Sequence, residues 1–450
     1  MIIDYPADRQ LNELVLNLFT CFAGLIFSNI LSYGLERQRR DLFQTKLELN
    51  NALMNSPYNF RKSSQYNGHP AFDSVATEVS IEMSDISTVS PDSSETTMEI
   101  DIELEKVDSK SNIIRKSDND FEKSMSNIRR SSSKKGIMSI KEYLNIVDEY
   151  NWPIFEFTIA TNGKPLTQLM EHICITSGLL KRLNLSEMHF LNFIENIEKG
   201  YHKDLRFHNS QHATDVVHCI YYLSRLPKIR KVLNDEDLLA LYIGAAIHDH
   251  DHPGFSNKFL QETNDSLAKR YNDRSVLENH HLSSSFAILD KKENNFFSSN
   301  QTQLYNDFRS SVIELVLATD LALHVPILQQ FKSRGAQFNP LTINEDKNLL
   351  MRLLMKCSDV SNPTKNFETI YSKWINLIMK EFYRQGDLEQ KYFGSVKSPF
   401  CDRKKSDEVG KCQKGFIEFI VFPLFESLKS FESNFNDKWL LSNRERFSVE

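Results

Sequence analysis

The feature that most constrains this chain is an apolar run at 238–247 that leads directly into the polar block His-Asp-His-Asp-His at 248–252. A helix that is apolar on nearly all sides belongs in a core, so it should carry the residues that follow it into the interior. Buried charges persist when they are paired or bound to a metal. His248 and Asp249 therefore offer a nitrogen and an oxygen ligand to a zinc-like cation, and Asp249 could also reach a second, harder cation. Taken alone, the pair is equally compatible with a helix-end hydrogen bond or a solvated turn.

Length, charge and cysteine content narrow the class of protein. A chain of 450 residues has room for one large domain or two ordinary ones. The net charge of −6 gives no basic face for nucleic acid, so we expect no nucleic-acid partner. The six cysteines are scattered without CxxC spacing, which argues against a disulfide scaffold or a thiolate zinc site and fits a reducing compartment.

The N-terminal segment carries a candidate membrane anchor. Residues 14–35 contain no charge, and the run is long enough to cross a bilayer as a helix. The basic flank at 36–40 would leave everything downstream in the cytosol. The sequence therefore predicts a membrane-anchor helix within residues 1–40. The alternative is an amphipathic helix that docks on the rest of the chain or pairs with a second copy as a homodimer.

Residues 41–138 form a second compositional region, rich in Ser, Asp, Glu, Lys and Asn, with few aromatic residues. Such a segment buries too little apolar surface to offset its ordering entropy, so the sequence predicts a disordered linker. Ser132 follows the pair Arg129-Arg130 and is a candidate site for a basophilic kinase. A phosphate there would add a charge of about −1.5 to −2, whereas the alternative is an unmodified, solubilising linker.

The remaining residues, 139–450, carry helical periodicity almost to the end, and no alternating run is long enough to propose a sheet. The sequence therefore predicts one compact, multi-helix, all-α domain. Four aromatic residues at helical spacing are assigned to its core: Phe286, Phe296, Phe297 and Phe308. Apolar residues at three-and-four spacing mark segments 166–175, 185–198, 238–247, 311–321, 348–357, 371–384 and 416–428.

Two further clusters supply candidate partners for His248 and Asp249. His208 and His212 are four residues apart and would share one helix face, so that one could bind metal while the other moves a proton. Downstream, another apolar helix ends in a carboxylate, Asp359. The three clusters together offer two imidazoles and two carboxylates, a set that leaves coordination positions open for water.

Seven motifs occur in order between residues 152 and 431, and together they resemble class I 3′,5′-cyclic nucleotide phosphodiesterases. The resemblance does not reach residues 1–138. It implies a compact all-α catalytic domain of the HD-type metallohydrolase kind at 139–450. The motifs lie at 208–216, 248–257, 271–281, 317–320, 358–363, 382–389 and 413–416.

The resemblance implies roles for individual residues around the cations. A tightly held Zn²⁺ would bind four ligands, and one of them, Asp249, would also bridge to a second ion, Mg²⁺ or Mn²⁺. His208 would be the proton donor to the leaving 3′ oxygen. Glu278 and His252 would support the metal centre from outside, and Thr319 would hydrogen-bond water on the second metal. The four ligands would be His212, His248, Asp249 and Asp359.

The resemblance also implies how substrate binds. Gln413 would hold the base edge through its amide, and Phe416 would stack on the purine face. Asn362 favours cyclic AMP over cyclic GMP, because an asparagine amide can pair with the donor and acceptor edge of adenine. The alternatives are a helix-capping asparagine and a dual-specificity or cyclic-GMP-preferring protein.

Three positions depart from the family pattern. Phe207 replaces a frequent tyrosine, which removes a hydroxyl near the proton donor and keeps an aromatic wall. Ile375 stands where threonine is frequent, near the base pocket. His250 lies between the two acidic positions of the 248–252 block, and we expect it to be a solvated surface imidazole.

The resulting functional expectation is hydrolysis of a 3′,5′-cyclic nucleotide to the nucleoside 5′-monophosphate. The nucleophile would be a hydroxide activated by two metal ions, with His208 as the proton donor. Two rival functions remain. One is a different His-Asp phosphohydrolase that acts, for instance, on nucleoside triphosphates, and the other is a membrane-tethered sensor that binds cyclic nucleotide without cleaving it.

Overall fold

The computed structural model describes residues 138–447. The predicted membrane anchor within 1–40 and the predicted linker, up to residue 137 and including Ser132, lie outside the described residues. The division of the chain at residues 40 and 138 therefore stays a prediction.

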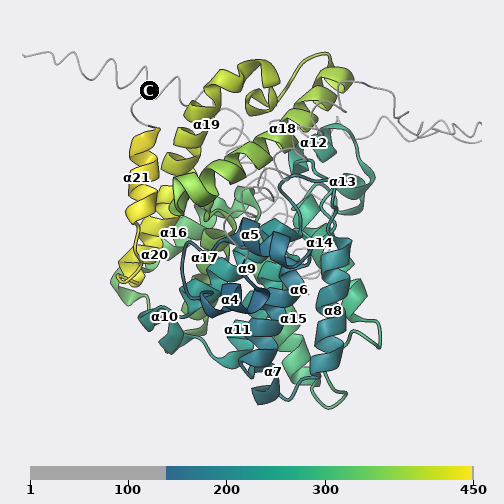
Figure 1. Cartoon of the computed structure of the whole chain (residues 1–450), viewed down its shortest axis with the longest axis vertical. Helices are drawn as coiled ribbons and strands as arrows, with labels where there is room; N and C mark the ends of the chain where they lie inside the picture. The colour runs from purple at the N-terminus through teal and green to yellow at the C-terminus, as the bar shows by residue number, and fades with distance from the viewer. Residues whose placement is uncertain (1–137, 448–450) are drawn as a thin grey trace, which may run out of the picture. The chain divides into compact units, whose positions relative to one another are not determined.

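All regular elements in residues 138–447 are helices, which confirms the predicted all-α class (Figure 1). The α-helices are α4 Ile140–Asn145, α5 Ile154–Ala160, α6 Pro165–Met170, α7 Leu179–Arg182, α8 Glu187–Gly200, α9 Ser210–Ser224, α10 Pro227–Val232, α11 Asp235–Ile247, α12 Asn257–Glu262, α13 Ser266–Arg270, α14 Val276–Leu289, α15 Thr302–Leu317, α16 His324–Arg334, α17 Asn344–Asp359, α18 Ser372–Phe393, α19 Val409–Phe416, α20 Phe422–Phe431 and α21 Lys438–Arg446. Three π-helical segments are η2 Glu171–Thr176, η6 Phe367–Tyr371 and η9 Ile417–Val421. Short 3₁₀ segments are η3 Leu321–Leu323, η4 Gly335–Gln337, η5 Asn362–Thr364, η7 Pro399–Cys401 and η8 Arg403–Glu408.

Helix α11 is the central helix of the core, in contact with α9 and α15. Its start is fixed by a capping box, in which the Asn234 side chain accepts from the Asp237 amide and the Asp237 carboxylate accepts from the Asn234 amide. All ten residues of the apolar run 238–247 are buried. The helix therefore delivers His248, its C-cap residue, to the interior as the sequence predicted.

Helix α9 begins later than the spacing of its histidines suggested. Asn209 is the N-cap, and its side-chain oxygen accepts from the Gln211 and His212 amides. His212 is therefore in the first turn of the helix, whereas His208 lies in the segment before it. The two rings still come close, with centroids 6.1 Å apart, but they do not share a helix face.

Helices α17 and α18 complete the frame of the site. Helix α17 ends at Asp359, and α18 crosses near the start of α9, where its Glu381 accepts from the Phe207 amide. Close packing of α18 against η7 depends on Gly386, since a Cβ there would lie 2.0 Å from the Cys401 carbonyl oxygen. Figure 1 shows α8 on one side of the described helices and α20 with α21 on the other.

The predicted core aromatic residues are confirmed. Phe286, Phe296 and Phe308 are buried, and Phe297 is partly buried against the same core. Phe296 also contacts Phe297 and Phe308, with ring centroids 4.7 and 6.1 Å apart. These rings therefore fill the interior rather than a ligand site.

The expectation for His250 is wrong, because this side chain is buried rather than solvated. Its Nδ1 lies 2.8 Å from the Ser284 hydroxyl, and burial lowers its pKa to about 4, so the ring is neutral. Gly200, at the end of α8, makes room for it, since a Cβ at that position would lie 2.0 Å from His250 Nε2. Because Gly200 has no side chain, the end of α8 leaves space for the His250 ring in the interior.

No one helix in residues 138–447 combines the length and apolar character needed to cross a bilayer. Two consecutive segments, Thr302–Leu317 and Leu321–Gln337, satisfy that requirement only together, and they are bent by 88°.

Candidate active site

Four side chains converge from three places in the chain, at the start of α9, the end of α11 and the end of α17. His212 Nε2 lies 3.6 Å from Asp249 Oδ2 and 3.3 Å from Asp359 Oδ1. His248 Nε2 lies 3.1 Å from Asp249 Oδ2 and 3.4 Å from Asp359 Oδ1. The structure thus brings the two imidazoles and two carboxylates of the predicted ligand set together.

These spacings suit one cation. Nitrogen and oxygen ligands at about 2.0–2.2 Å from a tetrahedral ion lie about 3.3–3.6 Å from each other, and the four distances run from 3.1 to 3.6 Å. His212, His248 and Asp359 form a group of donor atoms that could hold a metal ion. The distances between these side chains therefore fit a single bound metal ion.

Hydrogen bonds on the far side of His248 support the same conclusion. Its Nδ1 lies 2.9 Å from the Ala245 carbonyl, which can only accept, so Nδ1 carries a hydrogen and Nε2 is the nitrogen that faces the carboxylates. Nε2 is buried without a hydrogen-bond partner. A buried ring nitrogen that faces two carboxylates needs a positive charge between them, either a proton or a shared metal ion.

The electrostatics of the cluster require positive charge. Burial alone would raise the pKa of Asp249, but His248 outweighs it and holds that pKa well below its usual range. In the same way, burial would lower the pKa of His248, but Asp249 raises it well above its usual range. A proton on His248 thus balances carboxylate charge, and metal binding here would release that proton.

A second group of donor atoms adjoins the first and is made by Asp249, His252 and His281. His281 Nδ1 lies 2.6 Å from the His250 carbonyl, so its Nε2 lone pair is directed to Asp249 Oδ1, 3.7 Å away. His252 Nδ1 accepts from the Gly254 amide at 2.9 Å, so in the neutral ring Nε2 carries the hydrogen. His252 is therefore a donor toward this region and not a metal ligand, which fits the supporting position predicted for it.

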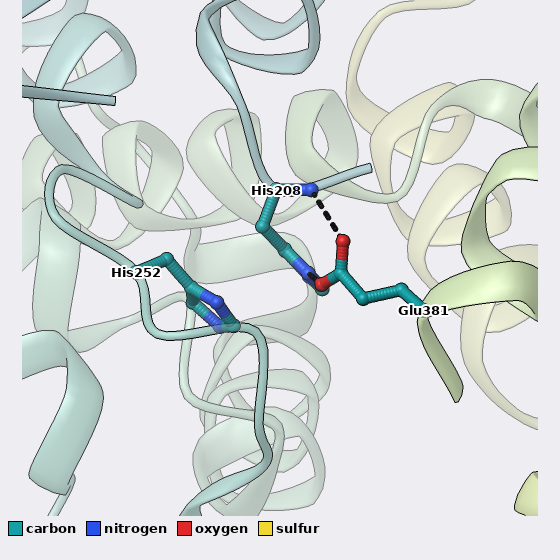
Figure 2. A group of neighbouring side chains, drawn as sticks. All are labelled: His208, His252 and Glu381. Carbon is teal, nitrogen blue, oxygen red and sulfur yellow. Dashed lines mark hydrogen bonds and ion pairs between the residues drawn. The ribbon is translucent and has the colours of Figure 1, made fainter. Parts of the chain in front are cut away.

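His208 lies between Glu381 of α18 and His252 of the loop after α11 (Figure 2). Its Nδ1 hydrogen-bonds Glu381, and the other carboxylate oxygen of Glu381 accepts from the His208 amide at 3.3 Å. The rings of His208 and His252 stack with centroids 4.1 Å apart and an angle of 16° between planes. Glu381 therefore fixes which nitrogen of His208 is directed into the site.

These neighbours set different protonation states for the two stacked rings. Burial alone would lower the pKa of His208, but the Glu381 carboxylate outweighs it and raises the pKa to about 9. Burial and then the charge on His208 hold the pKa of His252 well below its usual range. At neutral pH, His208 is protonated and His252 is not.

Glu278 lies close enough to Asp249 and Asp320 for their charges to act on it, and Thr319 precedes Asp320 in the chain. Asn257 donates to both carboxylate oxygens of Glu278, at 3.0 and 3.3 Å, and burial, with the charge of Asp320, raises the pKa of Glu278 to about 8. The Thr319 hydroxyl donates to the Val316 carbonyl at 2.7 Å. Its oxygen lone pairs remain as acceptors, which suits a hydrogen bond from water.

The predicted base-binding residues lie on α19 and η5. Gln413 and Phe416 are three residues apart on α19 and so share a face of that helix. Tyr371 donates its hydroxyl hydrogen to Gln413 Oε1 at 2.7 Å, which fixes the amide. Asn362 is buried at the start of η5, three residues beyond Asp359.

Two of the residues that differ from the family pattern, Phe207 and Ile375, lie near the site. The ring of Phe207 lies against His212, with centroids 4.5 Å apart, so the aromatic wall is present without a hydroxyl. Ile375 follows Trp374 in the first turn of α18, and both side chains are buried.

Sequence reasoning missed three residues that contact the site. Glu381 stands one position before the motif at 382–389, His281 is the last residue of the motif at 271–281, and Tyr371 begins the apolar segment 371–384. Each lay within or beside a recognised pattern. Their partners, however, are 31 to 173 residues away along the chain, so no local spacing links them.

Comparison with known proteins places the site in a family context. A family model described as 3′5′-cyclic nucleotide phosphodiesterase matches residues 207–439, which is more than half of the chain. The 3′,5′-cyclic-AMP phosphodiesterase 4C of Rattus norvegicus is 36% identical over 289 residues, 62% of this chain and 53% of that protein. The Mus musculus protein of the same name is also 36% identical over 289 residues, covering 62% of this chain and 42% of its own length.

An insect protein is equally similar. The Drosophila melanogaster 3′,5′-cyclic-AMP phosphodiesterase, isoform F, is 36% identical over 291 residues, which are 63% of this chain and 44% of that protein. The chain spans about half the length of the curated relatives that it matches. All the predicted site residues, from His208 to Phe416, fall inside the region matched by the family model.

Proposed function

The chain belongs to the 3′,5′-cyclic nucleotide phosphodiesterase family, and we propose that it hydrolyses a 3′,5′-cyclic nucleotide, with preference for cyclic AMP, to the nucleoside 5′-monophosphate. The observation that carries this proposal is that Nε2 of His212 and Nε2 of His248 each lie 3.1–3.6 Å from an oxygen of Asp249 and of Asp359, with a protonated His208 beside them.

The proposed cations follow from the donor sets. Two imidazoles and two carboxylates suit Zn²⁺ at the tight site of His212, His248, Asp249 and Asp359. The second site offers Asp249 as its carboxylate, and it suits Mg²⁺ or Mn²⁺, which keep several water ligands. The Thr319 hydroxyl donates to Val316 and so has lone pairs left to accept from one of these waters. When bound, the two cations would supply Lewis-acid activation of a water molecule and neutralise charge on the phosphoryl oxygens.

The chain's own groups perform the proton transfer. Water attacks phosphorus, the bond from phosphorus to the 3′ oxygen breaks, and the leaving oxygen needs a proton. His208 Nδ1 donates to Glu381, so the transferable proton is on Nε2. Because Glu381 holds the pKa near 9, the ring is protonated at neutral pH and can act as the acid. The proton lost by the attacking water balances the one that His208 gives.

The preference for cyclic AMP is supported by the base-binding residues and the relatives. The Gln413 amide, held by Tyr371, and Asn362 can together offer donors and acceptors to a purine edge. The three relatives described above are named as cyclic-AMP phosphodiesterases. Phe416, on the same face of α19 as Gln413, is suited to stack on the base.

Turnover of cyclic AMP and cyclic GMP by the purified full chain, with Mg²⁺ or Mn²⁺ supplied, tests the proposal. We expect hydrolysis of both, with the higher kcat/KM for cyclic AMP. A higher kcat/KM for cyclic GMP would overturn the preference. Binding without turnover, or turnover of nucleoside triphosphates alone, would overturn the activity in favour of a sensor or of another phosphohydrolase.

Membrane attachment through residues 1–40, phosphorylation at Ser132 and homodimer formation stay predictions. Fractionation of cells that express the chain with and without residues 1–40 tests the first. The predicted result is recovery of the full chain with membranes and of the truncated chain in the soluble pool.

A further inference from the structure

Lys356 is a buried lysine on α17, three residues before Asp359, with 2% of its surface exposed. Its ammonium nitrogen donates to the Ala318 carbonyl at 2.8 Å and to the Asp320 carbonyl at 3.2 Å. These two carbonyls flank Thr319, so the side chain reaches from α17 to both sides of the turn at 318–320.

The turn needs such a clamp because it follows the end of a helix. Helix α15 ends at Leu317, with Ala318 as its C-cap. The last carbonyls of a helix have no partner within it, and a lysine that reaches them satisfies these acceptors and the negative end of the helix dipole. The contact thus joins the C-terminal ends of α15 and α17.

The other side of the same turn is tied to α14. Asp320 Oδ2 accepts from the Ser275 hydroxyl at 2.8 Å, and Ser275 is the N-cap of α14, whose first turn carries Glu278. Ser275 itself has a positive φ of 41°, so its position depends on such contacts. The turn that presents Thr319 is therefore held between two helices that both carry site residues.

Charge explains why an ammonium group is tolerated in the interior. Burial lowers the pKa of Lys356 to about 8, while the carboxylates of Asp359, Asp320 and Glu278 act in the opposite direction. A buried cation is stable only with such compensation. Yet a fixed positive charge beside a cation site repels the cation, so electrostatics alone would favour its removal.

We propose that Lys356 is a positioning residue for the second cation: it clamps the 318–320 turn so that the Thr319 hydroxyl stays in place to accept from water on that cation. This inference rests on the proposed two-cation function. The proposal predicts the direction in which the affinity for the second cation changes. Loss of the ammonium weakens binding of the second cation, although it removes a positive charge from the neighbourhood.

The affinity is measured by Mn²⁺ titration of the full chain with the tight ion retained. Electron paramagnetic resonance follows the free Mn²⁺. Lys356→Met keeps the apolar stem and removes the donor, and we expect Mn²⁺ affinity to fall about 10- to 100-fold, the range for partners that orient metal ligands. Lys347→Met, on the same helix, removes a lysine that pairs with Asp237 and is the matched control. It should leave Mn²⁺ affinity unchanged.

A double variant separates positioning from general loosening. If Lys356 acts through Thr319, Lys356→Met combined with Thr319→Val should bind Mn²⁺ no more weakly than the weaker single variant. Ser275→Ala is a milder test from the α14 side, informative even if Lys356→Met fails to fold, and should weaken Mn²⁺ binding about 2- to 3-fold. This is the scale of a modest hydrogen bond.

The outcomes are distinguishable. Unchanged or tighter Mn²⁺ binding by Lys356→Met, or unchanged binding by Ser275→Ala, would overturn the clamp while the wild-type chain still binds Mn²⁺ and turns over substrate. A wild-type chain that binds no Mn²⁺ beyond the tight ion would overturn the two-cation function and the clamp together.

Discussion

His208 and His212 are four residues apart in the sequence, yet their surroundings give them opposite chemistry. His208 meets one carboxylate, Glu381, through Nδ1, and stacks on a neutral His252. His212 directs Nε2 toward two carboxylates, Asp249 and Asp359, at 3.6 and 3.3 Å. The first arrangement keeps a proton on the ring, whereas the second presents a lone pair to a shared cation.

The contacts of each ring determine the role of its imidazole. Both rings are neighbours of carboxylates, so proximity of charge alone does not separate them. What separates them is the nitrogen that the carboxylate contacts and the number of carboxylates for each ring. A partner on the far nitrogen orients and charges the ring, while a pair of carboxylates on the near nitrogen completes a coordination shell.

The largest effect is expected from removal of a metal ligand. Asp359→Ala should lose the tightly held ion. Its activity should fall further than it does when a general acid is removed, which typically costs about 10²–10⁴-fold. Metal content measured by plasma mass spectrometry and turnover of cyclic AMP check this. Asp346→Asn, a buried carboxylate on the same helix that pairs with Arg334, should keep the ion. Retention of the ion by Asp359→Ala would contradict the ligand set.

The next largest effect is expected from removal of the proton donor, with the metal ligands kept. His208→Ala should reduce kcat about 10²–10⁴-fold and leave metal content at the wild-type level, because this ring is not in the ligand set. His189→Ala on α8 is the control and should change neither quantity. If His208→Ala lost the ion, the two histidines would not have separate roles.

Glu381→Gln sharpens the comparison through pH. The carboxylate raises the pKa of His208 to about 9, above the about 6.5 of a free histidine. The pair therefore stabilises the fold fully below pH 6.5, and that stabilisation is lost as pH rises through about 9. In the variant, the alkaline fall in kcat should move to lower pH, and kcat should drop about 10- to 100-fold.

A control on the same helix separates this effect from general damage to α18. Glu389 is also buried and accepts from Ser398. Glu389→Gln should leave the pH profile of kcat in place, whatever it does to stability. An unshifted profile in Glu381→Gln would show that Glu381 does not set the charge of His208.

The smallest effect concerns the base, away from both histidines. Tyr371→Phe removes the hydroxyl that holds Gln413 Oε1, at a cost of roughly 0.5–1.5 kcal/mol. KM for cyclic AMP should rise about 2- to 12-fold, with kcat nearly unchanged and weaker discrimination against cyclic GMP. Tyr383→Phe is the matched hydroxyl deletion on α18. A fall in kcat without a change in KM would contradict the positioning of Gln413 by Tyr371.

The all-α fold and the central helix could be predicted because their signals are local. The run at 238–247 is apolar on every side, so burial of α11 and delivery of His248 to the interior follow from the pattern itself. The start of α9 was misplaced because the spacing of His208 and His212 matches one helical turn, whereas Asn209 caps the N-terminus and so starts the helix after His208.

What could not be predicted depends on contacts between distant segments. Glu381 reaches His208 across 173 residues, and nothing in the spacing of α18 marks its partner. His250 looked solvated because its neighbours are charged. Its burial is set by the space that Gly200 leaves, and that is visible only once α8 and the loop after α11 are packed together.

X-ray absorption spectroscopy at the zinc edge on the purified full chain shows whether the four side chains bind one metal ion. We expect a shell of nitrogen and oxygen ligands at about 2.0–2.2 Å, with the outer scattering of two imidazoles, and loss of one imidazole in His212→Ala. A sulfur shell at about 2.3 Å, or a spectrum unchanged in His212→Ala, would contradict the convergence of these four side chains on one ion.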